Sequence, residues 1–228
     1  TAVGKSALDA NTTGGSNTAL GADALSSDTL GSRNVAIGTS ALEVQNFTSA
    51  TTSYNVAIGF NAGAAITTGI NNTIMGGLAG DAITTASSNT ALGYFALGGN
   101  SLASANTAVG SGALAAHNVG SLAQTFNTAV GYDAGNAVTT GVENTLIGGL
   151  AGDANTTGSY NTAVGKGSLS ANTTANNNTG LGYQALLVNT TGASNTGVGA
   201  NALDENTTGS NNTALGLSAL NKNTTADN

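Results

Sequence analysis

The residues that could do chemistry are few and widely spaced. His117 is the only histidine, the chain has no cysteine, and the serines fall in repetitive, turn-like segments. A hydrolytic site needs a nucleophile, a base and an orienting group within reach of one another. The sequence offers no such set, so we expect a protein that is not an enzyme and that carries no cofactor.

Acidic residues are the only candidates for a metal site. Asp81 and Asp153 recur in the word GGLAGDA, which superficially resembles the calcium-binding nonapeptide of RTX proteins. The glycine spacing differs from that of the nonapeptide, and the word does not recur in successive repeats. We therefore interpret both residues as solvated turn residues and expect no metal ligand.

Charge and composition exclude two further classes of partner. The net charge is −7, and the only cations are Lys5, Arg33, Lys166 and Lys222, so no face could neutralise several phosphates of a nucleic acid. No run of about 18 apolar residues occurs, so we expect no membrane insertion in this segment. Only 7% of the residues are charged, and Asn, Thr and Ser must keep the surface wet instead.

An internal repeat must position whatever surface the chain presents. One glycine ends each word of the type NTAVG, and we call it the anchor glycine. Its spacing is 17 residues, except for two steps of 21 residues, and thirteen units cover residues 1–228 as a single array. The anchor glycines are Gly4, Gly21, Gly38, Gly59, Gly76, Gly93, Gly110, Gly131, Gly148, Gly165, Gly182, Gly199 and Gly216.

The residues before each anchor glycine predict a short strand. The preceding residue is always apolar, the residue three before is Thr or Val, and a small residue separates the two in most units. This alternation has the period of a strand. Asn stands four before the anchor glycine and predicts a ladder along stacked units, formed by Asn17, Asn34, Asn55, Asn72, Asn89, Asn106, Asn127, Asn144, Asn161, Asn178, Asn195 and Asn212.

A second segment follows each anchor glycine, with Ala three after it and usually Leu four after it. We expect this segment to form a second short strand, with Gly- and Asn-rich turns closing the coil. Because one coil cannot bury its own apolar face, the units must stack as a parallel β-solenoid. Either the Val/Ile/Leu row of the strands or the Leu row should then face another chain.

The two long steps each insert four residues, in the loops 43–54 and 115–126. Insertions in a solenoid map to loops on one side, often the binding side. We therefore take Phe47, Tyr54, His117 and Phe126 as candidate binding residues. Tolerated bulges without a binding role are the alternative interpretation.

The words NVAIG at 34–38 and 55–59, and the NTAVGxxAL type throughout, carry a family resemblance. The array resembles the repeats of trimeric autotransporter adhesin heads and of bacteriophage tail fibres, although its unit is longer than that of the adhesin heads. The resemblance implies a left-handed β-roll that forms a homotrimer, lies outside the cell or on a virion tail, and attaches to a cell-surface receptor or glycan.

Other interpretations stay open at this point. Thr stands eight after the anchor glycine in ten of the thirteen units, so an ice-binding Thr face is one alternative. A passive extracellular filament is another, because joining Asn228 to Thr1 nearly continues the repeat, as in a segment of a longer fibre or an end-to-end subunit. Words such as NTT, at Asn11 and Asn206, are also N-glycosylation sequons.

Overall fold

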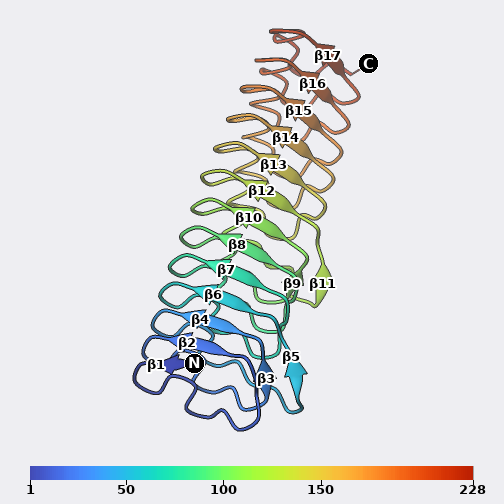
Figure 1. Ribbon diagram of the computed structural model, residues 1–228. Coiled ribbons are helices and arrows are strands. Elements are labelled where there is room, and N and C mark those ends of the chain that lie inside the picture. Colours follow the sequence, from blue (N-terminus) through green and yellow to red (C-terminus); the bar gives the residue numbers. More distant parts are fainter. Residues whose placement is uncertain (228) are drawn as a thin grey trace. The chain divides into compact units, whose positions relative to one another are not determined.

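The computed structural model describes residues 1–227 and is all-β. Its described residues form short strands joined by turns, with no helix (Figure 1). The chain divides into two compact units. The first comprises Thr1–Ser111 with Asn118–Gln124, and the second comprises Gly112–His117 with Thr125–Asn228. Both units are built from the same coil, and the division between them falls in the second long loop.

Each coil contributes one strand that ends beside its anchor glycine, as the sequence predicts. In the first unit these strands are β1 (Ala2–Val3), β2 (Thr18–Leu20), β4 (Val35–Ile37), β6 (Val56–Ile58), β7 (Thr73–Met75), β8 (Thr90–Leu92) and β10 (Thr107–Val109). In the second unit they are β12 (Thr128–Val130), β13 (Thr145–Ile147), β14 (Thr162–Val164), β15 (Thr179–Leu181), β16 (Thr196–Val198) and β17 (Thr213–Leu215).

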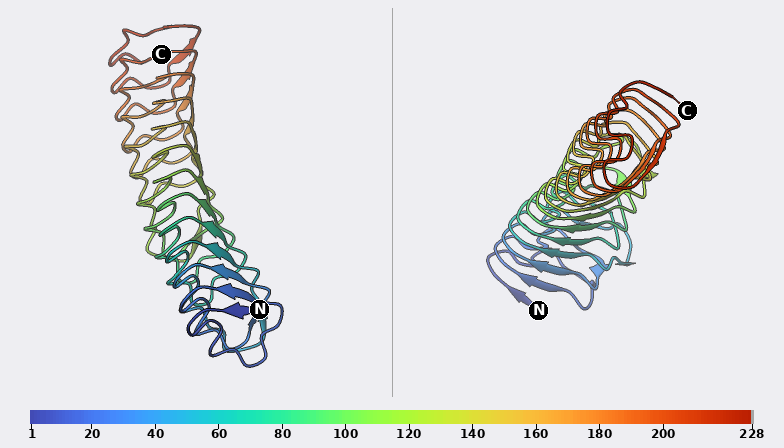
Figure 2. Two further views of the ribbon diagram at one scale, coloured as in Figure 1. Left: turned by 60° about the vertical axis from the view of Figure 1, so that its left-hand side comes forward. Right: turned by 90° about the horizontal axis from the view of Figure 1, so that it is seen from above.

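Within each unit the strands pair in parallel, and like residues lie over like. Thr162 pairs with Thr179, for example. The register also survives the first long step, where Ala36 pairs with Ala57. Figure 2 shows that successive turns of the chain lie over one another within either unit. The predicted parallel β-solenoid of about thirteen coils is confirmed.

The second predicted strand is wrong. The segment after each anchor glycine is a series of turns, in which the residues two and four after the glycine adopt positive φ. Asp23 and Leu25, for instance, have φ of 56° and 51°. A strand needs negative φ throughout. The turns bend the chain so that the Leu side chains point into the coil, and Leu25, Leu97 and Leu186 are fully buried.

The predicted Asn ladder is buried and hydrogen-bonded, and it joins side chains mainly to backbone. The Asn144 side-chain oxygen accepts a bond from the Asn161 backbone N–H at 3.0 Å, and the Asn144 amide donates to the Gly158 carbonyl at 2.9 Å. Each ladder Asn is at most 6% exposed. The ladder therefore satisfies inward-facing backbone groups that have no strand partner, which would otherwise be costly to bury.

A second Asn column, seven after the anchor glycine, was not foreseen. In the second unit, Asn172, Asn189 and Asn206 each donate an amide hydrogen bond to the side-chain oxygen of the Asn in the coil before. These distances run from 2.8 to 3.2 Å. The side chains therefore pair amide to amide along the stack, as some members of the first ladder also do, for example Asn144 with Asn127 at 3.1 Å. The Asn of each of these NTT words is therefore buried in the interior of the coil, although the word itself forms a turn.

The total side-chain volume in the core stays similar from coil to coil, because a larger residue at one position is matched by a smaller residue at the neighbouring position. Most coils have Ala two before the anchor glycine and Leu four after it. In the second unit, Leu146 takes an Ala position, and Gly135 and Gly152 take the nearby Leu positions. A Cβ added to Gly135 or Gly152 would lie 2.6 or 2.7 Å from a Leu146 methyl carbon. Glycine therefore stands where a larger neighbour already fills the space.

The two long steps build small second sheets within the first unit. β5 (Thr51–Thr52) pairs in parallel with β3 (Gly31–Ser32), and β11 (Ala123–Gln124) pairs in parallel with β9 (Ala103–Ser104). Each insertion thus lays an extra strand on the coil before it. The insertions are ordered structure, in contrast to simple bulges.

Candidate interaction surfaces

The acidic residues do not form a metal-binding cluster in the described part of the chain. Within residues 1–227, no three His, Cys, Asp or Glu side chains gather as a metal site. Asp153 accepts a hydrogen bond from the Ser170 hydroxyl at 2.6 Å, and partial burial raises the pKa of Asp81. None of the described residues forms a helix of the length and hydropathy that crossing a bilayer requires. The exposed surfaces of the two units are the candidate contacts for a partner.

The outer face of the strands is the most regular surface in each unit. The middle residue of a strand points inward, as Ala91 and Ala163 do with no exposure, and its two neighbours point outward. The last residue is apolar. It is exposed where it is Leu, as in Leu20 (46%), Leu92 (43%) and Leu181 (36%), and partly buried in several strands where it is Val, as in β10 and β14. Of the two apolar rows that could face another chain, the Val/Ile/Leu row is outside and the Leu row is inside.

The first residue of each of these three-residue strands adds a row of Thr or Val to the same face. Consecutive strands in a sheet lie about 4.8 Å apart, so Thr and apolar side chains repeat at that spacing. The face carries no charged residue on any of these strands. It is therefore neutral, apolar and periodic.

The Thr row eight after the anchor glycine has a different role. The Thr139 hydroxyl donates to the Thr156 carbonyl of the next coil at 3.0 Å, and the Thr156 hydroxyl donates to the Thr173 carbonyl at 2.9 Å. These hydroxyls close the turns between coils and are half-buried. They are not a free Thr face.

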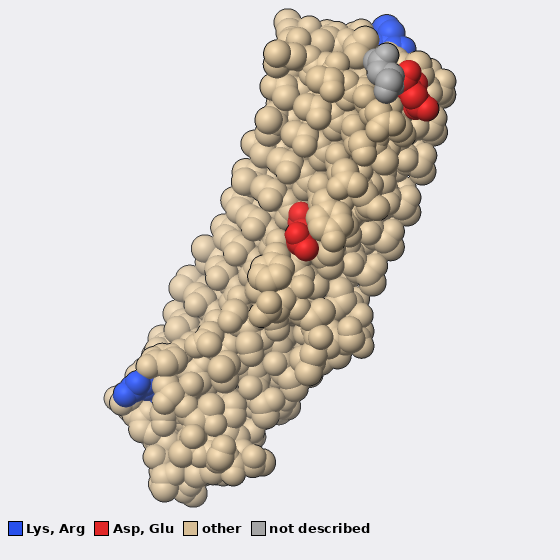
Figure 3. Space-filling view, turned by 90° about the vertical axis from the view of Figure 1, so that its right-hand side faces the viewer, with Lys and Arg blue, Asp and Glu red and all other residues tan. Residues whose placement is uncertain are grey.

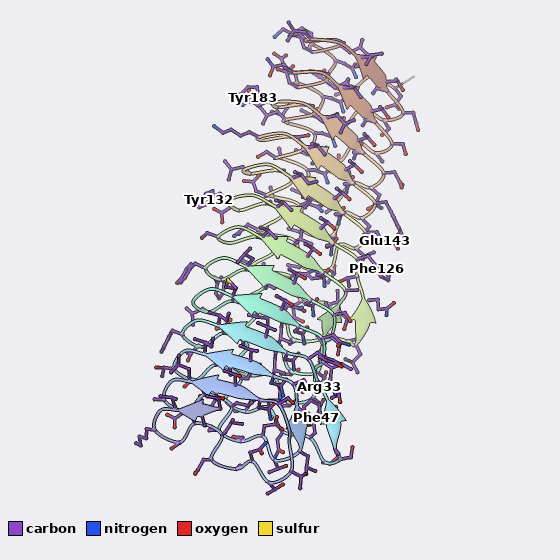
Figure 4. All side chains as sticks on the ribbon, in the orientation of Figure 1. Arg33, Phe47, Phe126, Tyr132, Glu143 and Tyr183 are labelled. Carbon is purple, nitrogen blue, oxygen red and sulfur yellow. The ribbon has the colours of Figure 1, made fainter. Side chains whose placement is uncertain are left out.

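Two of the four predicted binding residues are exposed and two are buried. Tyr54 is 49% exposed and Phe126 53% exposed, whereas Phe47 is 6% exposed and His117 is fully buried. Phe47 and His117 therefore cannot offer their side chains to a partner in this fold, which corrects the expectation of four exposed binding residues. Figure 4 shows Arg33 and Phe47 on the edge of the first unit's coils where its strands begin, and Phe126 on the edge of the second unit's coils where its strands begin.

His117 fills the same interior column as the second Asn ladder. Its Nε2 atom lies 3.0 Å from the Thr125 hydroxyl and 3.4 Å from the Asn127 side-chain nitrogen. Burial lowers the pKa of His117 to about 4, against a smaller opposing effect of the Thr139 backbone. The side chain is therefore a neutral core residue at physiological pH. Gln45 fills the corresponding place in the first long loop, where it donates to Asp28 at 2.9 Å.

The first long loop places a cation on an aromatic ring. The Arg33 guanidinium carbon lies 5.6 Å from the centre of the Tyr54 ring, and its Nη1 donates to the Tyr54 hydroxyl at 2.6 Å. Both residues stand five before an anchor glycine, in consecutive coils. This corner position, which we call the corner column, has positive φ, 64° at Arg33 and 49° at Tyr54.

The second long loop borders a small cavity in the first unit. The cavity has a volume of about 260 Å³, and no charged side chain lines it. Its walls come from β9, β11 and the preceding coil, and its lining residues are Ser87, Ser88, Ser104, Ala105, Leu122, Ala123 and Gln124. Ala105 stands in the corner column one coil before the end of the second long loop, as Arg33 stands one coil before the end of the first, so no long side chain occupies this position here.

Exposed aromatic residues outside the loops were missed by the sequence analysis. In the second unit, Tyr132 and Tyr183 follow anchor glycines and are 63% and 49% exposed, and Tyr160 in the corner column is 53% exposed. The sequence could have indicated their exposure, because they stand one residue after or five residues before an anchor glycine, outside the positions assigned to the strand and its interior. Figure 4 shows Tyr132 and Tyr183 on the edge of the coils opposite Phe126 and Glu143.

The sequon of Asn206 is closed to modification in the folded protein. Its side chain is fully buried and donates to the Asn189 side-chain oxygen and to the Gly209 carbonyl. A glycan on this nitrogen would require the coil to open.

Comparisons with protein-family models, with curated proteins and with solved structures each return no match.

Proposed function

We propose that the chain is a structural and adhesive fibre segment that associates with copies of itself, as a homotrimer, through the outer face of its strands. The observation that carries this proposal is the row of apolar side chains at the strand ends, which point outward in every coil and are exposed in about half of them and partly buried in the rest. Monomeric soluble proteins rarely leave a contiguous apolar surface of this kind open. The parallel β-solenoid and the resemblance of its NTAVG words to fibre repeats favour the same role, outside the cell.

Burial of this face can drive association. Each exposed Leu, Ile or Met on the strands would contribute on the order of 1 kcal/mol when its open part is covered. The face holds no charged group whose desolvation would oppose the contact. Several coils acting together would therefore hold chains side by side without ion pairs between them.

The test is the mass of the purified chain in solution by light scattering, compared with that of two double variants. L92K/L181K places one charge on the strand face of each unit, and T68K/T174K places the same charges on exposed turn residues. We expect the unmodified chain and T68K/T174K to have the mass of three chains, and L92K/L181K to dissociate. A single-chain mass for the unmodified protein would overturn the proposed association.

Attachment to a cell-surface receptor or glycan is the second part of the proposal, and the long loops are the proposed contact. Tyr54 and Phe126 expose their rings there. A fibre that adheres through these loops should lose cell binding in Y54A/F126A while it keeps its oligomeric mass. Unchanged binding would favour the passive filament, which has no receptor.

Ice binding is the one other function that a specific observation favours. The strand face presents Thr, a buried residue and then an exposed apolar residue on most of its strands. Such a row repeats hydroxyl and methyl groups at the strand spacing of about 4.8 Å. This Thr row is three before the anchor glycine, whereas the sequence suggested the row eight after it. A single-chain mass combined with thermal hysteresis would support ice binding over the fibre.

A further inference from the structure

We propose that Phe126, Glu143 and Tyr160 in the second unit form a binding site for an organic cation of the guanidinium type. The three residues occupy the corner column of three consecutive coils, 17 residues apart. Each is exposed, and the rings of Phe126 and Tyr160 are both 53% exposed. A carboxylate thus stands between two aromatic rings.

The backbone holds the three side chains in register. The Glu143 N–H donates to the Thr125 carbonyl at 2.8 Å, and the Tyr160 N–H donates to the Val142 carbonyl at 3.0 Å. Their φ angles are alike, at 50°, 56° and 61° along the chain. Each residue also precedes a buried ladder Asn, namely Asn127, Asn144 or Asn161. The side chains therefore leave equivalent corners, about 4.8 Å apart from coil to coil.

This spacing suits a cation. Cation–π attraction acts when the charge lies within about 6 Å of a ring centre. A planar cation held by the Glu143 carboxylate would lie about 5 Å from the column position of each ring. It could bond to the carboxylate and contact either aromatic face, which a neutral ligand would exploit less well.

The first unit shows how the corner column accommodates such a group. There the Arg33 guanidinium already lies over the ring of Tyr54 in the next coil. In the second unit Glu143 stands one coil before Tyr160, where Arg33 stands one coil before Tyr54. The corner column thus supplies a cation in the first unit and an anion in the second, so this column of the second unit holds no cation of its own.

No cation of the second unit is placed to fill the site. Its two cations are Lys166 and Lys222. Lys222 bonds to Glu205 in the only ion pair among the described residues. Lys166 directly follows an anchor glycine, as Tyr132 and Tyr183 do, and Figure 4 shows those two on the edge opposite Glu143. Figure 4 places Glu143 on the right-hand side of the view, and Figure 3, which shows that side, has few charged groups of either sign on a largely uncharged surface.

The site does not depend on the proposed self-association. The corner column lies two residues before the first residue of each strand, outside the face that we assign to contacts between chains. A failure of the proposed self-association would therefore leave the cation site intact, whereas the proposed receptor contact shares Phe126 with it and is tested separately by cell binding.

The experiment is a titration of the full chain followed by NMR of labelled aromatic rings. The probes are ethylguanidinium, its uncharged counterpart ethylurea, and methyl glucoside. We expect only ethylguanidinium to shift the Phe126 and Tyr160 resonances, with a millimolar dissociation constant. E143Q should weaken binding at least about fivefold, because the charge-assisted contact is lost. Y183A, an exposed Tyr on the other edge, should bind like the unmodified chain.

A second variant, E143R, tests whether a group at position 143 can reach the ring of Tyr160. E143R should place its own guanidinium on Tyr160, as Arg33 does on Tyr54, and abolish binding of the added probe. A Gly-Arg-Gly peptide separates the two sources of a guanidinium. Tighter binding than ethylguanidinium indicates an Arg side chain of a protein partner, and equal binding indicates a free small cation. Equal shifts by ethylurea or methyl glucoside, or undiminished binding in E143Q, would overturn the proposal.

Discussion

At the scale of single residues, the anchor glycines are set by the close approach of one coil to the next. Gly148 has φ of 133°, and a Cβ built on it would lie 2.6 Å from the carbonyl carbon and oxygen of Gly165. The obstacle is backbone, which cannot turn away as a side chain can. The recurrence of this glycine could be read from the sequence, but the contact that requires it needed the stacked structure.

We expect Gly148→Ala to lower the free energy of unfolding by about 3 kcal/mol or more, through backbone strain and a clash with the adjacent coil. Gly149→Ala is a matched control, because the nearest atom to its added Cβ is the Tyr132 carbonyl oxygen at 4.0 Å. Urea denaturation measures both variants. Similar stability of G148A and G149A would contradict a role for close backbone approach.

His117 makes the stability of the second unit depend on pH. Its pKa falls from 6.5 to about 4 on burial, so the unfolded chain binds a proton in this range and the folded chain does not. Stability is therefore lost as pH falls from 6.5 to 4, by about 3 kcal/mol. In H117Q, which places at this position the residue type that Gln45 supplies in the first long loop, this pH-dependent part of the stability should be absent. Parallel stability–pH curves for the two proteins would show that His117 is not a buried neutral group.

The buried amides show where residue-level prediction stopped. Asn17 and its equivalents could be assigned to a ladder because they recur beside a strand. Asn189 and Asn206 lie in words that are also typical of solvated turns and of glycosylation sites, and the side-chain pairing that buries them has no separate sequence signal. The same limit applies to His117, whose type suggested binding and whose column makes it interior.

At the scale of elements, the strand before each anchor glycine was predictable from the sequence, whereas the conformation of the segment after it was not. Alternation before the anchor glycine predicted the strands, and the need of each coil to stack on the next predicted their parallel pairing. The segment after the glycine was misassigned because Ala and Leu carry no mark of positive φ, which non-glycine residues adopt at a cost of roughly 1–2 kcal/mol. Burial of Leu25, Leu97 and Leu186 offsets that cost, and only the folded coil shows it.

Some coils have Gly in place of Leu four after the anchor glycine, because a larger residue two before an anchor glycine, such as Leu146, fills the same space. We expect Leu146→Ala to lower the free energy of unfolding by about 2–5 kcal/mol, because it leaves a cavity beside Gly135 and Gly152. The double variant L146A/G152L should recover part of this loss. The coil of Ala163 and Leu169 already has this Ala–Leu combination, with both side chains fully buried. A Leu at position 152 can adopt the required backbone conformation, because φ is 56° at Gly152 and 53° at Leu169.

Thermal unfolding of the two variants and of G152L alone measures this compensation. G152L alone should be destabilised, since its side chain would meet Leu146. If the double variant were no more stable than L146A, the glycines would have to be explained by backbone conformation and not by core volume.

At the scale of the whole molecule, the chain is held by neutral interactions. Charged residues make up 7% of the sequence, and the one ion pair among the described residues joins exposed side chains, Lys222 and Glu205. Exposed pairs contribute about 0–1 kcal/mol. Amide ladders, parallel strand pairing and an Ala- and Leu-rich interior must therefore supply the stability, and composition alone already indicated this balance.

This balance predicts how salt acts on the proposed association. Screening by 1 M sodium chloride weakens ionic contacts between exposed groups, but it should leave the oligomeric mass unchanged, because the strand face has no charge. Sodium sulfate should strengthen association, since excluded salts favour burial of apolar surface. Light scattering at both conditions checks this expectation, with ethylguanidinium binding to the corner column as an internal reference that sodium chloride should weaken. Dissociation in sodium chloride would instead indicate an ionic interface and would remove the strand face from consideration.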